Sequence, residues 1–275
     1  MEPLIINVCL TGIVPQKADN PYTPITPEEI IADAGKVIKL GATVLHIHAR
    51  ENDGSSTYKK ELYAKIIQGI RKLNPGVVIC VTTSGRIFTS FSKRSDVLEL
   101  DAYAKPDFAS LFLGSMNFPK KAVVNSPKMI VKLATKMKRY GIHPEWEVFE
   151  PGMLHFGKYL VEKGILENPR WINIILGSLG ASPATPEIFS LFRSMIPSNY
   201  RWAGGGVGRF QLAVNTMAIE YGGHVRVGME DSFYMDPGKK KLATNPDLVE
   251  RILTIAKSYD RKIATIEQTR KLLLA

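Results

Sequence analysis

The chain has 275 residues, 45% hydrophobic and 23% charged, which is typical of a globular protein with a sizeable core. No apolar run approaches the ~18 residues of a membrane-spanning helix, and Met1-Glu2-Pro3 lacks the basic and apolar regions of a secretory signal. We therefore expect a cytoplasmic protein with no membrane contact, in which Cys9 and Cys80 are buried, reduced thiols.

The net charge of +10 is compatible with a nucleic-acid partner or with an anionic small molecule. Lysine clusters such as residues 239–241 have no interleaved aromatic residues and belong to no recognisable nucleic-acid module. We therefore expect these clusters to lie in solvated loops, with no nucleic-acid partner. A small acidic ligand that carries phosphates fits the charge equally well.

Strand-like and helix-like patterns alternate through the first half of the chain. Thr26 begins a helix with unusual clarity, because Glu29 completes a capping box and Pro27 suits the first turn. The sequence predicts strands over residues 4–10, 44–50, 77–82 and 108–113, and helices over residues 26–40, 62–73 and 126–140.

The alternation continues to the end of the chain. The predicted strands are residues 145–149, 171–176, 201–203 and 224–227, and the predicted helices are 153–163, one from Thr185, 210–221, one from Asn245 and one from Thr265. Eight strands that alternate with helices, most of them apolar on both faces, predict a closed parallel (β/α)₈ TIM barrel. We expect one domain over residues 1–275, with a short helical addition at the C-terminus. An open doubly wound sheet is the alternative, and it explains less readily why polar residues gather at the carboxyl ends of many strands.

The motif His46-Ile47-His48 lies in one of these apolar strands. Side chains two residues apart on a strand face the same side, so both imidazoles face one layer of packing together. Neutral imidazole is a good zinc ligand, and a catalytic zinc site takes three protein ligands. The alternative is that both histidines are hydrogen-bonded groups of the core or of a pocket.

The third ligand is expected just after the last strand. If the extended conformation persists through residues 226–230, Arg226, Gly228 and Glu230 face the barrel interior together, and Glu230 lies at its rim. Asp231 follows and points differently, as a carboxylate that can act as general base while Arg226 fixes its position or relays a proton. The alternative is an ordinary ion pair between Arg226 and Asp231 that closes a loop.

Other polar residues are expected at the same end of the barrel. Residues 82–86 supply small hydrogen-bond donors, and Ser110 and Glu147 are expected to line the cavity. The glycine-rich segment 204–209 resembles the phosphate-binding turn that many barrels have after their seventh strand, although glycines also serve simply to permit a tight turn. For His143, His155 and His224 we expect surface or core roles, and Phe88, Phe91, Phe112 and Phe118 are candidates for an apolar wall.

These motifs together resemble those of the β-keto acid cleavage enzymes, over essentially the whole chain. The matching segments are Thr11-Gly12, Pro24-Ile25-Thr26-Pro27-Glu28-Glu29, His46-Ile47-His48-Ala49-Arg50, Gly114-Ser115-Met116-Asn117-Phe118, Pro144-Glu145-Trp146-Glu147-Val148-Phe149 and Gly228-Met229-Glu230-Asp231. The resemblance implies a zinc-dependent barrel that converts a β-keto acid and acetyl-CoA into acetoacetate and a new acyl-CoA. It also implies a homo-oligomer, with a tetramer as the expected form.

The resemblance also implies roles for individual residues. It implies that His46, His48 and Glu230 bind zinc, that Asp231 works with Arg226 to remove a proton from the substrate, and that Glu147 is an active-site acid. Thr82, Gly85 and Ser110 fall on positions that contact substrate. For the phosphates of acetyl-CoA, the glycine segment offers Gly206, Gly208 and Arg209.

Two positions depart from family members that act on an amino-substituted keto acid. Val14 replaces an acidic residue that can pair with a cation, and Phe112 replaces a polar residue. Because burying an ammonium group without a partner is costly, we expect a substrate with a neutral or apolar substituent.

Two other functional classes remain open at this stage. Zinc hydrolases built on the same barrel also use an H-x-H strand, but usually on the first strand and with further histidines on the fifth and sixth, and residues 171–176 here contain none. A non-catalytic metal-binding protein would bind metal without any CoA-dependent turnover.

Overall fold

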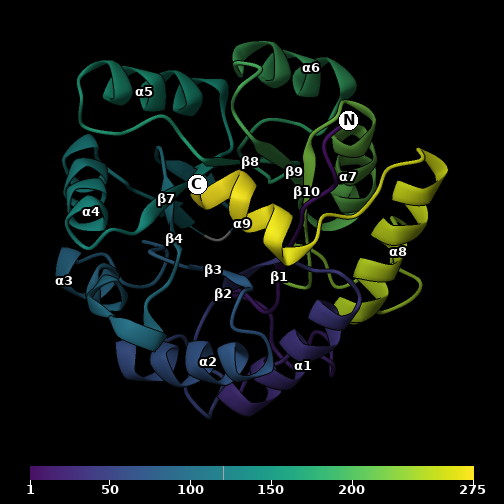
Figure 1. The fold of residues 1–275 in the computed structure, drawn as a ribbon, viewed down its shortest axis with the longest axis horizontal. Helices are drawn as coiled ribbons and strands as arrows, with labels where there is room; N and C mark the ends of the chain where they lie inside the picture. The colour runs from purple at the N-terminus through teal and green to yellow at the C-terminus, as the bar shows by residue number, and fades with distance from the viewer. Residues whose placement is uncertain (120) are drawn as a thin grey trace.

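A closed barrel of eight parallel strands forms the centre of the computed structural model, which describes residues 1–119 and 121–275 (Figure 1). The order around the barrel is β1-β10-β9-β8-β7-β4-β3-β2. The strands are β1 (Ile6–Cys9), β2 (Val44–Ile47), β3 (Val78–Val81), β4 (Phe108–Phe112), β7 (His143–Val148), β8 (Trp171–Leu176), β9 (Trp202–Gly206) and β10 (His224–Val227). The predicted TIM barrel is therefore confirmed.

A ring of helices surrounds the strands in Figure 1. Its members are α1 (Pro27–Lys39), α2 (Lys60–Leu73), α3 (Phe91–Arg94), α4 (Pro127–Arg139), α5 (Pro151–Glu162), α6 (Pro186–Met195), α7 (Gln211–Glu220) and α8 (Asn245–Ser258). The capping box predicted at Thr26 and Glu29 is present at the start of α1. No helix in the described ranges is both long and apolar enough to cross a membrane.

The terminal helix α9 (Ile266–Leu274) lies across the centre of the barrel in Figure 1. Its Leu273 belongs to a buried cluster with side chains from the amino-terminal ends of the strands, including Ile5, Val44, Phe108 and Trp171. The helix therefore covers the amino-terminal end of the barrel. The helix leaves the carboxyl end uncovered, which is where barrels of this kind carry their chemistry.

Several boundaries differ from the sequence prediction. β7 begins at His143, two residues earlier than expected. The stretch before β4, read from the sequence as irregular, contains α3 and two short 3₁₀ turns, Asp96–Glu99 and Ala102–Ala104. A hairpin of β5 (Met116–Phe118) and β6 (Lys121–Val123) was not predicted, because three-residue strands carry too little periodicity to be recognised. The two cysteines are free and buried, as expected.

The expected glycine turn after the seventh strand is wrong over residues 204–206, because β9 continues to Gly206. A side chain at Gly204 would meet Ala218 of α7 at 2.8 Å, and one at Gly205 would meet Arg226 of β10 at 3.1 Å. At Gly206 it would lie 2.7 Å from the backbone nitrogen of Gln211. These glycines therefore let α7 and Arg226 pack directly on the strand, and the segment turns only at the 3₁₀ residues Gly208–Phe210.

This packing predicts that Gly206→Ala destabilises the protein more than Gly208→Ala. The new methyl group at residue 206 meets backbone that cannot move aside, and overpacking of this kind typically costs about 1–3 kcal/mol or more. Gly208 has a φ of +59° but open space around it, so alanine there meets only the left-handed backbone strain of roughly 1–2 kcal/mol. Urea unfolding of both variants measures the difference, and a Gly208→Ala variant that is the less stable of the two would contradict this account.

His224, the first residue of β10, is 2% exposed, and its Nδ1 accepts a hydrogen bond from the Ile5 amide at 3.0 Å. Burial, together with the charges of Arg261 and Arg201, lowers the pKa of His224 to about 3. In the unfolded chain the pKa is about 6.5, so between these two values protons bind only to the unfolded state. The contribution of His224 to stability is therefore complete above about pH 6.5 and is lost as the pH falls toward 3.

We expect His224→Gln to flatten the acid side of the stability profile. Urea midpoints of the parent protein should fall between about pH 6.5 and pH 4, and those of the variant should fall less steeply over the same interval. Parallel profiles for the two proteins would show that His224 does not contribute to acid sensitivity.

Candidate functional site

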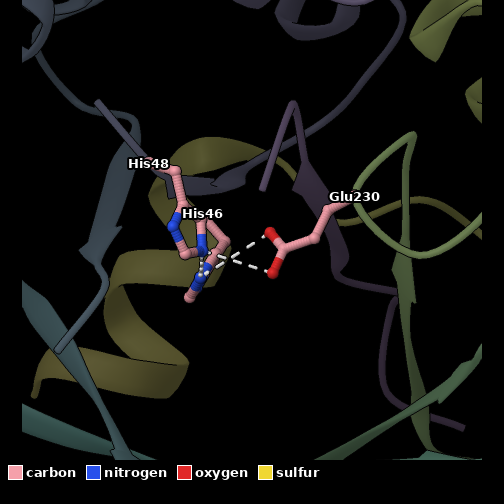
Figure 2. Close-up of side chains that lie close together, drawn as sticks. All are labelled: His46, His48 and Glu230. Carbon is pink, nitrogen blue, oxygen red and sulfur yellow. Dashed lines mark hydrogen bonds and ion pairs between the residues drawn. The ribbon is translucent and has the colours of Figure 1, made fainter. Parts of the chain in front are cut away.

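Three side chains converge at the carboxyl end of the barrel. His46 lies in β2, His48 is the first residue after that strand, and Glu230 lies in the turn after β10 (Figure 2). The two Nε2 atoms are 3.2 Å apart, and Glu230 oxygens lie 3.2 Å from His48 Nε2 and 3.8 Å from His46 Nε2. In Figure 2 the carboxylate faces both rings. The structure thus brings together the three residues that the sequence analysis proposed as metal ligands.

The donor atoms fit a bound cation. Tetrahedral ligands at the usual zinc distances of about 2.0–2.1 Å are about 3.3 Å from one another, close to the three separations observed here. Glu230 Oε2 is buried without a hydrogen-bond partner in the described part of the chain. Two imidazoles and a carboxylate are also a ligand set that catalytic zinc takes.

A second carboxylate, that of Glu145 in β7, lies beside the other ring nitrogen of His46. Glu145 Oε1 lies 3.4 Å from His46 Nδ1, and the Glu145 side chain is fully buried. Asn173 of β8 donates a hydrogen bond to the same oxygen. Metal-binding histidines usually direct their second nitrogen to such a carboxylate, which fixes the ring orientation. Sequence analysis missed this residue, although Glu145 and Glu147 alternate along β7 as His46 and His48 alternate at β2.

The buried guanidinium of Arg226 connects the remaining acids. Its Nε donates to Asp231 at 2.9 Å, its Nη1 to Glu147 at 3.2 Å and its Nη2 to Glu230 at 3.2 Å. The Arg226 side chain is 2% exposed. One residue of β10 therefore holds acids from β7 and from the turn after β10 at the floor of the same cavity.

The local electrostatics differ between these acids. Burial raises the pKa of Asp231, although Arg226 acts against it, and burial raises the pKa of Glu147 to about 7. Burial also favours the neutral form of Glu230, but the charges of His48, His46 and Arg226 outweigh it and hold the pKa of Glu230 well below its usual range. Burial would lower the pKa of His46, whereas Glu230 and Glu145 raise it to about 9. Glu230 is thus kept ionised, as a metal ligand must be.

Glu230 does not reach its place by extension of β10, as the sequence analysis supposed. The strand ends at Val227, Gly228 has a φ of +142°, and the amide of Asp231 donates back to the Gly228 carbonyl at 3.2 Å. The Glu230 amide then donates to the carbonyl of Cys9 at 3.2 Å, which ties the turn to the end of β1.

The loop after β1 closes around Glu230. A side chain at Gly12 would lie 2.6 Å from Glu230 Cγ, so this position has no room for one. The guanidinium of Arg50 donates to the Gly12 carbonyl at 2.7 and 2.9 Å and to the Gly54 carbonyl at 2.9 Å. Gly12 and Arg50, noted in the sequence only as parts of motifs, therefore position the third member of the cluster.

A cavity of about 360 Å³ opens above these groups. Its wall includes His48, Glu147, Arg226, Glu230 and Asp231, and also the predicted substrate residues Thr82 and Val14. Much of the remaining wall is apolar and comes from Ile13, Phe112, Phe118, Pro119, Val123, Phe149, Leu179, Val207 and Phe233. Phe112 and Phe118 thus form part of the expected apolar wall. Phe88 lines a small neighbouring pocket, and Phe91 lies beneath lysines of α4.

Other predicted residues lie beside the cavity but do not line it. The Ser110 hydroxyl accepts a hydrogen bond from the Thr83 amide, and Gly85 packs against the guanidinium of Arg94. Of the expected phosphate-binding residues, Gly208 lines the cavity. The backbone at the start of α7 packs directly against Gly206, and Arg209 is exposed beside Phe210.

Comparison with known proteins gives one consistent result. Residues 3–274 match the family model of the beta-keto acid cleavage enzymes. A 3-oxoadipate:acetyl-CoA acetyltransferase of Cupriavidus necator is 35% identical, with 99% of this chain and 95% of that protein covered. A 3-keto-5-aminohexanoate cleavage enzyme of Acetoanaerobium sticklandii is 34% identical, with 99% and 98% covered.

Among solved structures, a ternary complex of ObcA with a C4-CoA adduct and oxalate superposes with a TM-score of 0.78 at 19% identity, covering 92% of this chain and 67% of that one. That likeness concerns the fold. The match over residues 3–274 and the two relatives, similar over almost their whole length, concern the family as well. The chain therefore belongs to the β-keto acid cleavage enzyme family.

Proposed function

We propose that this protein is a zinc-dependent enzyme that converts a β-keto acid and acetyl-CoA into acetoacetate and a new acyl-CoA. The observation that carries the proposal is the convergence of His46, His48 and Glu230 beside an Asp231 held by Arg226, at the floor of one cavity. The names of the relatives support it, since they include β-keto acid substrates and acetyl-CoA.

His46, His48 and Glu230 would hold the zinc ion. A zinc ion bound there would polarise the keto carbonyl of the substrate and acidify the carbon between the keto and carboxylate groups. Glu145 would act through His46, by fixing the orientation of its ring. The remaining chemistry belongs to side chains that do not bind the metal.

Asp231 would remove the proton from that carbon. It is next to Glu230 in the chain and lines the cavity. Arg226 donates to both of its carboxylate oxygens, from Nε to Oδ2 at 2.9 Å and from Nη2 to Oδ1 at 3.5 Å. Because burial raises the pKa of Asp231, the carboxylate is a better base than an exposed aspartate. Arg226 would orient it, as a guanidinium does when it donates to both carboxylate oxygens.

The carbon that loses its proton then attacks the acetyl thioester, and CoA leaves as a thiolate. The thiolate attacks the original keto carbon, and the carbon–carbon bond beside it breaks. The carbanion released by this cleavage takes up a proton and becomes acetoacetate, which contains the acetyl group, and the rest of the keto acid leaves as acyl-CoA. We propose that Glu147, whose pKa burial raises to about 7, supplies or accepts a proton in these steps.

We propose that Thr82 contacts the substrate and that Gly85 and Ser110 contribute to substrate binding indirectly. Thr82 lines the cavity, and Ser110 and Gly85 would act from just behind it, through the loop of residues 82–86 that they hold. For acetyl-CoA we propose contact with Gly208 at the cavity wall. Gly206 and Arg209 would contribute indirectly, by shaping the segment that contains Gly208.

We further propose that the keto acid carries a neutral or apolar substituent. Val14 and Phe112 line the cavity where a cationic group would need an acidic partner. The cavity carboxylates Glu147, Glu230 and Asp231 are all engaged by Arg226. A cytoplasmic location and assembly into a homo-oligomer, with a tetramer suspected from the family, stay predictions from the sequence.

The reaction can be tested with zinc-loaded protein, acetyl-CoA and a panel of β-keto acids. We expect acetoacetate and acyl-CoA to form together from short aliphatic keto acids, at least about tenfold faster than from 3-keto-5-aminohexanoate, because an unpaired buried ammonium is costly. Chromatography of both products gives the rates, and reactions without acetyl-CoA serve as the control. Hydrolysis without acetyl-CoA would contradict the proposed function, whereas preference for the amine would contradict only the specificity.

Three variants separate the proposed roles. We expect Glu230→Gln to lose both metal and turnover. Asp231→Asn should keep the metal but lose about 10²-fold or more in kcat. Glu145→Gln should bind zinc about 10–100-fold more weakly and recover turnover when zinc is in excess.

Competition with a chromogenic chelator measures zinc affinity in the same preparations used for kinetics. Glu167→Gln, at a side chain that is 68% exposed, is the matched control and should behave as the parent protein. Full turnover by Asp231→Asn, or unchanged zinc affinity in Glu230→Gln, would refute these assignments.

A further inference from the structure

One cation in the wall of the cavity differs from the other arginines around it. Arg86, in the loop after β3, is half-buried and lines the cavity, yet its guanidinium has no carboxylate or carbonyl partner in residues 1–119 and 121–275. The neighbouring arginines all have acceptors: Arg226 binds carboxylates, Arg50 binds the Gly12 and Gly54 carbonyls, and Arg94 binds Thr83 and Asn125. The donors of Arg86 are thus left for something that enters the cavity.

An aromatic ring packs against this guanidinium. Arg86 Cζ lies over the Phe118 ring, 4.0 Å from its centroid, which helps to hold the cation in place. Its N–H donors lie in the guanidinium plane, where they match the oxygens of a carboxylate or phosphate. A planar cation held in this way is prepared to bind a carboxylate or phosphate in two-point fashion.

Two hydroxyl groups beside Arg86 are also free to donate. Thr82 Oγ1 accepts a hydrogen bond from the Ser84 amide at 3.0 Å, and Ser84 Oγ accepts one from the Arg86 amide at 3.3 Å. Neither hydroxyl proton has an acceptor within the part of the chain that the structure describes, and both residues line the cavity. The loop therefore presents a cation and two donors, and no acid.

We propose that Arg86, with the Thr82 and Ser84 hydroxyls, forms a subsite for an anionic oxygen group, separate from the metal ligands. This inference rests on the proposed function and extends it. The group is either the distal carboxylate of a β-keto dicarboxylic acid or a phosphate of CoA, since both present the same oxygens. If the keto acid carries a neutral substituent, as proposed above, the group is a phosphate of CoA.

Equilibrium binding to zinc-loaded protein distinguishes the sources without requiring turnover. Calorimetry compares CoA with pantetheine, which lacks the phosphates and the adenosine, and hexanedioate with hexanoate, which lacks the second carboxylate. We expect Arg86→Met to weaken binding of one anionic ligand, CoA or hexanedioate, by about tenfold or more, the size typical of a charged hydrogen bond. The affinity for its partner compound, pantetheine or hexanoate, should change by less than about twofold. Arg86→Lys keeps the charge but loses the planar guanidinium, so its affinity for that anionic ligand should lie between those of the parent protein and Arg86→Met.

Arg139→Met is the matched control, because Arg139 also lies beside an aromatic ring, that of Tyr140, but on the exposed side of α4. It should bind all four compounds as the parent protein does. The proposal is overturned if the parent protein binds neither anionic ligand more tightly than its partner compound, or if Arg86→Met binds all four as the parent does. Either result is independent of whether any keto acid is turned over.

Discussion

The buried guanidinium of Arg226 is the group on which the arrangement of the site depends. It is 2% exposed and contacts Glu147, Glu230 and Asp231, and its Nη1 lies 3.7 Å from Glu145. A buried charge requires partners that compensate for its lost hydration, and these acids supply them. The compensation is nevertheless unequal, because four carboxylates surround two cationic groups, the Arg226 guanidinium and His46, whose pKa is raised to about 9. A divalent cation between His46, His48 and Glu230 would restore most of the balance, so the electrostatics and the ligand geometry favour the same conclusion.

Closure of the barrel is what brings these groups together. β1 pairs with β2 on one side and with β10 on the other, so that Cys9 is opposite His46 while its carbonyl accepts the Glu230 amide. The third ligand thus reaches the other two across a single strand, although it is far from them in sequence. Gly12, held by Arg50, leaves just enough room for the Glu230 side chain. The sequence motifs around these residues therefore act as one structural unit.

The most periodic features were predictable from the sequence alone. The strands, the capped helices and the pairing of His46 with His48 follow from alternation and capping chemistry, which are local. The position of Glu230 was anticipated for the wrong reason, because a glycine turn and not an extended strand delivers it. The extent of β9 depends on α7 and Arg226 packing against glycines, and the environment of Arg86 depends on Phe118 of an unpredicted hairpin. Such contacts join distant segments and leave no periodic signal in the sequence.

Crystals of the zinc-loaded protein, measured on both sides of the zinc absorption edge, test the central claim most directly. This account predicts a strong anomalous difference peak bonded to His46 Nε2, His48 Nε2 and Glu230 at distances of about 2.0–2.2 Å, with Asp231 outside the coordination sphere on Arg226. A peak elsewhere, or none between these three side chains in crystals grown with excess zinc, would contradict it.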